Sequence, residues 1–131
     1  MKLFFDESVG ATVPSPLQHV GAPCAEIVRP TRAGSVTLGT SDLAWLAIAG
    51  REGYLVITHD FGILEVPAEK ATLVASRVGA VFIPGGTEPR WKVLRLLLRH
   101  WELLERIDAM ETRPFAFHMP MRGRARRLNL V

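Results

Sequence analysis

Short apolar runs that alternate with helix-compatible segments constrain the fold of this chain more strongly than any other feature of its sequence. Residues 54–58 form the clearest run, and residues 2–5 and 80–83 are similar. Continuous apolar runs of this length are typical of parallel strands that are buried on both faces. A further strand is predicted at 25–28, and helices at 40–51, 67–77 and 89–108. Alternating strands and helices predict a three-layer α/β/α sandwich with a mainly parallel central sheet.

Prolines, glycines and a cap residue refine these boundaries. Ser41 is suited to cap the start of helix 40–51, and Gly53 to end it. Pro14 and Pro16 interrupt a helix between residues 9 and 20. Around a glycine turn, residues 115–119 and 126–130 are predicted to form a final hairpin. The apolar face predicted for helix 89–108 consists of Trp91, Leu94, Leu98, Trp101, Leu104 and Ile107.

Length and composition indicate a single domain, residues 1–131, of an ordinary globular class. Hydrophobic residues make up 48% of the chain and charged residues 22%, which excludes a disordered polypeptide. No apolar stretch reaches the roughly 18 residues of a membrane span, and Asp6 comes too early for a signal peptide. The single cysteine, Cys24, fits a reducing cytoplasm, where we expect the protein to reside. We interpret Cys24 as a buried structural thiol, because no base is marked for a nucleophile.

Three aspartates fall where one edge of such a sheet would bring them together. Asp6 ends the first apolar run, Asp60 ends the clearest one, and Asp42 opens a helix. Open α/β folds place their sites at the carboxyl edge of the sheet. Carboxylates gathered there are tolerated when a divalent cation such as Mg²⁺ or Mn²⁺ neutralises them. Singly, each aspartate has a structural explanation as a turn or helix-dipole residue, but their shared location favours a metal-dependent phosphodiester site.

Neighbouring polar residues extend the predicted site. Thr58 lies two residues before Asp60, so on a strand it points to the same side, where its hydroxyl can hydrogen-bond a carboxylate. Glu7 is a candidate additional ligand, and Ser8 can contribute a hydroxyl. His59 is predicted to point away from Thr58 and Asp60, because adjacent strand residues face opposite ways.

Basic side chains gather in two places in a chain of net charge +3. Lys92, Arg95 and Arg99 share one face of the predicted helix 89–108. The arginine-rich C-terminal segment, about residues 120–131, contains no acid. Both clusters suit an RNA backbone, with salt-sensitive and weakly sequence-specific affinity, although a solvated tail or a protein-binding arm is an open alternative for the C-terminal one. Its arginines are Arg122, Arg124, Arg126 and Arg127.

Three segments resemble PIN-like domains. They are residues 4–8 (FFDES), residues 42–46 (DLAWL) and residues 50–60 (GREGYLVITHD), the last being the most specific. Within that group the chain is most similar to compact proteins related to VapC-type toxins of bacterial toxin–antitoxin pairs. The similarity runs from the first strand to about Ile83 and continues more loosely through the basic end.

This resemblance implies an Mg²⁺- or Mn²⁺-dependent endoribonuclease. By matching position, Asp6, Asp42 and Asp60 take the places of the catalytic, metal-binding acids, and Thr58 that of the family's hydroxyl. Hard oxygen ligands without a His/Cys cluster favour these ions over zinc, and such an ion activates a water for attack on the phosphate. Many PIN nucleases add a fourth acid after the third; here no firm candidate is identified, and Glu65 is not assigned as a ligand.

The resemblance also implies partners: an RNA substrate and a small DNA-binding antitoxin encoded nearby. A homodimer is left open. Because the acid set is incomplete, a PIN-like module that binds RNA or a protein without cleaving is a second hypothesis. A receiver-like signalling domain is a third, disfavoured because Lys70 and Lys92 fall in predicted helices rather than at a strand end.

Overall fold

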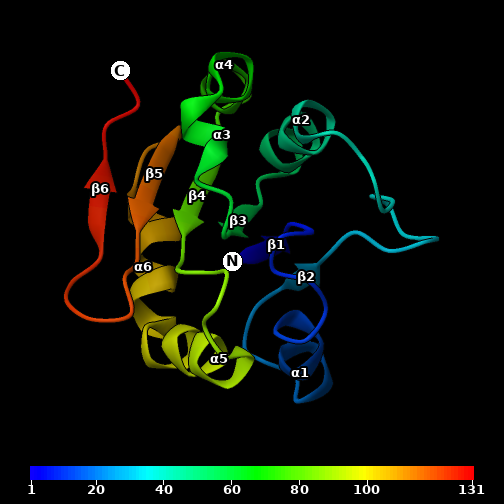
Figure 1. The fold of residues 1–131 in the computed structure, drawn as a ribbon, viewed down its shortest axis with the longest axis vertical. Coiled ribbons are helices and arrows are strands. Elements are labelled where there is room, and N and C mark those ends of the chain that lie inside the picture. The colour runs from blue at the N-terminus through cyan, green and yellow to red at the C-terminus, as the bar shows by residue number, and fades with distance from the viewer.

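A six-stranded sheet runs through the centre of the computed structural model, which describes all residues from Met1 to Val131. The strand order is β2-β1-β3-β4-β5-β6 (Figure 1). The first five strands are parallel, and β6 pairs antiparallel with β5, which confirms the mainly parallel sheet and the final hairpin. The strands are β1 (Lys2–Phe5), β2 (Glu26–Val28), β3 (Leu55–Thr58), β4 (Gly79–Phe82), β5 (Phe115–His118) and β6 (Arg126–Leu128).

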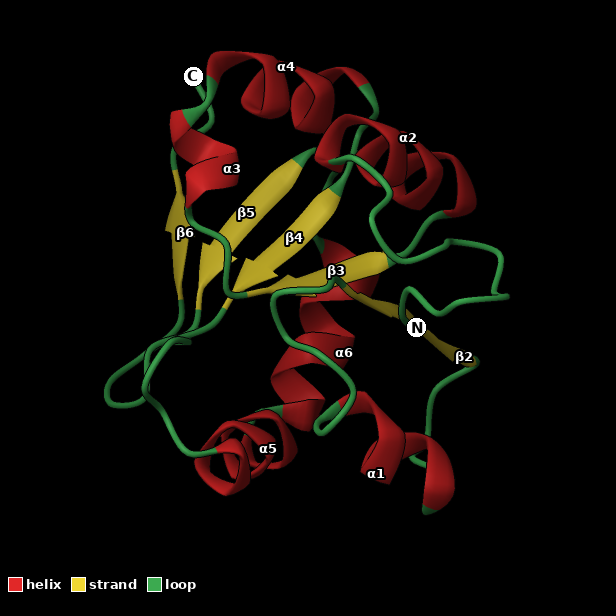
Figure 2. Ribbon diagram, turned by 45° about the vertical axis from the view of Figure 1, so that its right-hand side comes forward, coloured by secondary structure: helices red, strands yellow, loops and turns green.

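Helices cover both faces of this sheet, so the predicted three-layer sandwich is confirmed. One layer contains α2 (Asp42–Glu52), α3 (Gly62–Glu65) and α4 (Pro67–Ala75). Figure 2 shows these three helices on one side of the sheet and the remaining three on the other. The second layer contains α1 (Pro14–His19), α5 (Arg90–Arg99) and α6 (Trp101–Met110).

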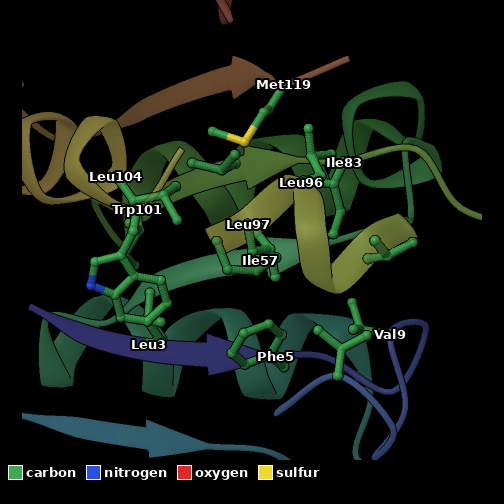
Figure 3. Packing of buried hydrophobic residues seen from close by; sticks show 14 of the residues in the cluster. Leu3, Phe5, Val9, Ile57, Ile83, Leu96, Leu97, Trp101, Leu104 and Met119 are labelled. Atoms are coloured by element: carbon green, nitrogen blue, oxygen red, sulfur yellow. The ribbon is translucent and has the colours of Figure 1, made fainter. Parts of the chain in front are cut away.

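Each face of the sheet has its own hydrophobic core, because alternate strand residues point to opposite layers. Leu3, Phe5 and Ile57 pack with residues of α1, α5 and α6, as Figure 3 shows for most of this cluster. Phe4 and Val56 pack on the other face, with residues of α2, α3 and α4. Both faces of every central strand are buried. This explains why these strands are uninterrupted apolar runs in the sequence.

The predicted helix 89–108 is two helices, because the chain departs from helical geometry at His100 (φ −104°, ψ 17°). This break changes which residues face the core. Trp91 is 65% exposed and Leu98 50% exposed, so their assignment to a single apolar face was wrong. The residues of α5 that are buried are Val93, Leu96 and Leu97.

The first helix is shorter than its sequence signal, and the prolines explain its start. α1 begins at Pro14, where the missing N–H is not needed, so the predicted 9–20 helix forms only in its second half. In α2 the boundaries are as predicted: the Ser41 hydroxyl accepts a hydrogen bond from the Ala44 N–H at 3.3 Å, and Gly53 ends the helix with a left-handed φ of +72°. The one-turn α3 was not predicted.

Two further predictions concern membrane-spanning segments and the burial of Cys24. None of the helices combines the length and apolar character needed to cross a bilayer. Cys24, expected to be buried, is only partly buried against the α1–α5–α6 core, and burial raises the pKa of its thiol.

Candidate metal centre

The three predicted aspartates lie at the carboxyl edge of the sheet. Asp6 directly follows β1, Asp60 comes two residues after the end of β3, and Asp42 is the first residue of α2. Because β1 and β3 are parallel neighbours, their carboxyl ends lie side by side. The topology therefore brings together residues that are up to 54 positions apart in the sequence.

A set of three carboxylates at this edge has the spacing of a metal site. One oxygen from each of Asp42, Asp60 and Glu69 lies within 4.8 Å of the others. Glu69, in the first turn of α4, was not predicted from the sequence, and Glu65 does not belong to the set. Oxygen ligands of this kind suit Mg²⁺ or Mn²⁺, so the residues present fit the ion expected from the sequence.

The pKa of Glu69 reflects the crowding of carboxylates at this edge. A hydrogen bond shared with Asp42 raises the pKa of Glu69 to about 7, and burial and the charges of Asp42 and Asp60 add to the effect. A carboxyl group has such a pKa when other carboxylates surround it and no basic side chain of the protein offsets their charge. This is the electrostatic environment that a divalent ion would stabilise.

Asp6 lies beside the trio rather than within it. It is 4% exposed, and each of its oxygens accepts a hydrogen bond: Oδ2 from the Thr58 hydroxyl at 2.8 Å and Oδ1 from the Ser8 hydroxyl at 2.5 Å. Burial raises the pKa of Asp6 from its ordinary 3.8 to about 6, against these hydrogen bonds, which lower it; the charges of Asp60 and Asp42 raise it further. The three predicted acids thus interact electrostatically.

The Thr58 hydroxyl links two of the acids. It donates to Asp6 and accepts from the backbone N–H of Asp60 at 2.9 Å. Ser8 makes a parallel link, because its hydroxyl donates to Asp6 and accepts from the backbone N–H of His59 at 3.0 Å. These two hydroxyls connect the end of β1 to the end of β3. The hydrogen bond from Thr58 to a carboxylate was predicted from the sequence, whereas the link between the strand ends was not.

Two more contacts orient the trio. The Trp45 indole Nε1 donates to Asp42 Oδ1 at 2.8 Å, and the Gly62 N–H donates to Asp60 Oδ1 at 3.0 Å. Glu7, by contrast, is exposed and accepts a hydrogen bond from the Gly39 N–H. The trio does not include Glu7, although Glu7 and Asp6 both line a surface depression of about 250 Å³.

His59 points away from the acids, as predicted. Its Nδ1 lies 3.1 Å from the Ile83 carbonyl oxygen, and its Nε2 lies 3.1 Å from Arg90 Nη1. Burial and the Arg90 charge lower the pKa of His59. A carbonyl oxygen can only accept and a guanidinium N–H can only donate, so these two partners favour the tautomer in which Nδ1 donates and Nε2 accepts. The ring thereby connects the end of β3 to the start of α5.

The predicted basic residues divide into two groups. Lys92, Arg95 and Arg99 of α5 line a hollow of about 320 Å³ together with Arg122 from the loop between β5 and β6. Arg127 is not part of it; its guanidinium pairs with Glu111 and lies over the Phe117 ring. Arg124 and Arg126 are exposed and do not line the hollow.

Comparison with known proteins identifies a family. The sequence model of the PIN like domain family matches residues 1–85. Searches of curated proteins and of solved structures found no match. The matched region ends before α5 and contains Asp6, Asp42, Thr58, Asp60 and Glu69.

Proposed function

Because the chain belongs to the PIN-like domain family, we propose that it is an Mg²⁺- or Mn²⁺-dependent endoribonuclease. PIN domains are generally nucleases that use divalent ions. The observation that carries the proposal is the convergence of Asp42, Asp60 and Glu69 oxygens within 4.8 Å at the carboxyl edge of the sheet. No additional acid was assigned from the sequence, which left a non-cleaving module open as an alternative, and Glu69 is the candidate for that acid.

The side chains around this edge have distinct roles in the proposed reaction. Asp42, Asp60 and Glu69 would hold the ion, and Asp6 adds a buried carboxylate beside them. A bound Mg²⁺ or Mn²⁺ would supply an acidified water and offset charge on the phosphate. Thr58 and Ser8 hold Asp6 in place by hydrogen bonds, and Thr58 also fixes the backbone at Asp60. Trp45 restricts the orientation of Asp42.

RNA is the proposed substrate, in line with the family resemblance and the uncompensated basic surface. Lys92, Arg95, Arg99 and Arg122 supply cations for a phosphate backbone, in addition to the exposed Arg124 and Arg126. Such contacts give affinity that falls with salt and depends weakly on sequence. Family membership disfavours the receiver-like alternative, and β5 ends at His118 rather than at a lysine.

Cleavage by the purified protein tests the enzymatic proposal. Labelled single-stranded RNA and the matching DNA are incubated with the chelated protein, with and without added Mg²⁺ or Mn²⁺. We expect internal cuts in RNA that require the ion and are lost in Asp60→Asn. RNA binding without ion-dependent cuts would support the non-cleaving module instead.

A toxin role is the finer proposal, and it rests on the resemblance of residues 4–8, 42–46 and 50–60 to VapC-type proteins. A small DNA-binding antitoxin would then mask the acids, with an arginine or lysine pairing with Asp6 and Asp60 in place of the ion. Expression of the wild-type chain should slow growth, co-expression of the neighbouring gene should relieve it, and Asp60→Asn should be harmless. Equal growth of all three strains at matched expression would remove the toxin proposal.

A further inference from the structure

The hollow beside α5 contains more positive charge than the protein itself neutralises. Lys92, Arg95, Arg99 and Arg122 line it, Glu88 is its one acid, and Met121 completes the wall. None of these four basic side chains takes part in an ion pair of the structure, whose pairs involve the N-terminus, Arg51, Arg113 and Arg127. Like charges held in one concavity raise its potential and attract an anion from solution.

The spacing of these cations suits a chain of phosphates rather than a single one. Lys92 and Arg99 are seven residues apart on α5, which places their backbone positions about 10 Å apart along the helix axis. Arg95 lies between them, so three cations follow one line. A nucleic-acid strand carries one charge for about every 3.4 Å of helix axis, so a short stretch of backbone can contact several of them at once.

An exposed indole accompanies this row. Trp91 is 65% exposed and lies one helical turn before Arg95, on the same side of α5. Bases of single-stranded nucleic acid stack on exposed aromatic side chains, and this indole is accessible for such a contact. Cations in a line with an aromatic beside them favour RNA over an acidic protein segment, which offers no bases.

The helix that lines the hollow contacts the strand end beside the metal centre. α5 begins at Arg90, whose guanidinium contacts the ring of His59, the residue between Thr58 and Asp60. Gly85 leaves room for the His59 ring, because a Cβ at residue 85 would lie 2.5 Å from His59 Cγ. The loop that carries Arg122 leaves the carboxyl end of β5 and passes beside α5 (Figures 1 and 2). The hollow and the acids are therefore both built on segments that follow the carboxyl ends of strands.

From these observations we infer that the α5 hollow holds the backbone of the substrate RNA several nucleotides away from the bond that is cleaved. The inference rests on the proposed ribonuclease function for the identity of the ligand. It implies a substrate class: single-stranded RNA that is long enough to reach from the acids, past His59 and Arg90, to Arg99. Short RNAs that fill only the metal centre should bind and react less well.

Binding and cleavage of a nested series of single-stranded RNAs, extended on one or the other side of a fixed cut site, test this inference. Binding is measured by fluorescence anisotropy in the Asp60→Asn background without added metal, so that it does not depend on activity. The test variant is Arg95→Gln/Arg99→Gln. The matched control is Arg77→Gln/Arg106→Gln, which removes the same charge from exposed positions outside the hollow.

We expect affinity to rise when the RNA passes a threshold length on one side only. The test variant should lower the affinity for long RNA about tenfold and flatten its salt dependence, while the control should change neither. Trp91→Ala should also lower the affinity for the same long RNAs. Circular dichroism of each variant verifies folding.

The possible results distinguish a failure of the role proposed for the α5 hollow from a failure of the proposed ribonuclease function. Ion-dependent cleavage that is independent of RNA length, or equal effects of the test and control variants, would overturn the inference and leave the ribonuclease intact. No RNA binding at any length would also overturn it. Length-dependent binding that the test variant abolishes, in a protein that cuts no RNA, would support the inference while removing the ribonuclease.

Discussion

Trp45 donates a hydrogen bond from its indole Nε1 to Oδ1 of Asp42, at 2.8 Å. The same ring is 3% exposed and stacks on Phe4 with 5.3 Å between ring centroids. From its apolar neighbours on the helix, packing rather than base stacking is the role predicted for Trp45, and the burial of the ring agrees with packing. The hydrogen bond adds a second role, because it couples the core under α2 to an acid of the metal centre.

Trp45→Phe should separate these two roles. Phenylalanine keeps the stack on Phe4 but cannot donate to Asp42, so we expect a loss of about 1 kcal/mol in unfolding free energy together with weaker Mn²⁺ binding. Trp45→Ala should cost about 3–5 kcal/mol, because it also leaves a cavity. Urea unfolding and calorimetric Mn²⁺ titration measure both effects. Unchanged Mn²⁺ affinity in Trp45→Phe would show that the hydrogen bond does not organise the site.

Thr58→Val tests the hydroxyl that links Asp6 to the backbone of Asp60. Valine has nearly the same shape, but it leaves a buried carboxylate oxygen and a backbone N–H without their partner. We expect a loss of about 1–3 kcal/mol in unfolding free energy and a strong loss of cleavage. Thr58→Ser keeps the hydroxyl and is the control. Equal stability and activity of the two variants would refute the linking role.

Asp6 should make the metal-free protein less stable as the pH rises. Its pKa is about 6 in the folded chain and 3.8 as its ordinary value, so between these values the folded state holds the proton more tightly. That stability is complete below about pH 4 and is lost as pH rises through 6, a change of about 3 kcal/mol. Asp6→Asn lacks this titration.

The measurement is the difference in unfolding free energy between Asp6→Asn and the wild type, in chelator, at acidic and at mildly alkaline pH. The difference should shift in favour of the variant as the pH rises. Glu69 titrates in both proteins, so its contribution largely cancels. A difference independent of pH would mean that Asp6 is not strained by its burial.

Glu69→Gln should weaken metal binding, whereas Glu65→Gln should not. Glu69 contributes one of the three converging oxygens. Glu65, four residues earlier and at the end of α3, is exposed and outside the set. Calorimetric titration with Mn²⁺ on both variants provides a matched comparison. Equal affinities would exclude Glu69 from the site.

The fold was largely predictable because its signals are local. Buried parallel strands such as Leu55–Thr58 are continuous apolar runs, and α2 has an unambiguous cap at Ser41 and stop at Gly53. The break at His100 was not predictable from periodicity, because apolar residues continue through it on both sides. Trp91 and Leu98 therefore appeared to be core residues, and their exposure became visible only in three dimensions.

The site was predictable where acids follow strands, as Asp6 does directly after β1 and Asp60 does two residues after the end of β3. Glu69 was missed because it is separated from the strand by the unpredicted α3, and its approach to Asp42 depends on how α4 packs against α2. A glutamate in the first helical turn after Pro67 has an ordinary explanation in the helix dipole. The one available signal was its position in the first helix after Asp60, at the same edge of the sheet.

In the proposed reaction, Asp42, Asp60 and Glu69 hold the divalent ion that cleavage requires. The most direct measurement is anomalous X-ray scattering from crystals of the protein with Mn²⁺ and a non-cleavable RNA analogue. We expect an anomalous peak in contact with oxygens of these three residues, next to Asp6, and no such peak in crystals of Asp60→Asn. A peak elsewhere, or none at an Mn²⁺ concentration that supports cleavage of RNA, would contradict this expectation.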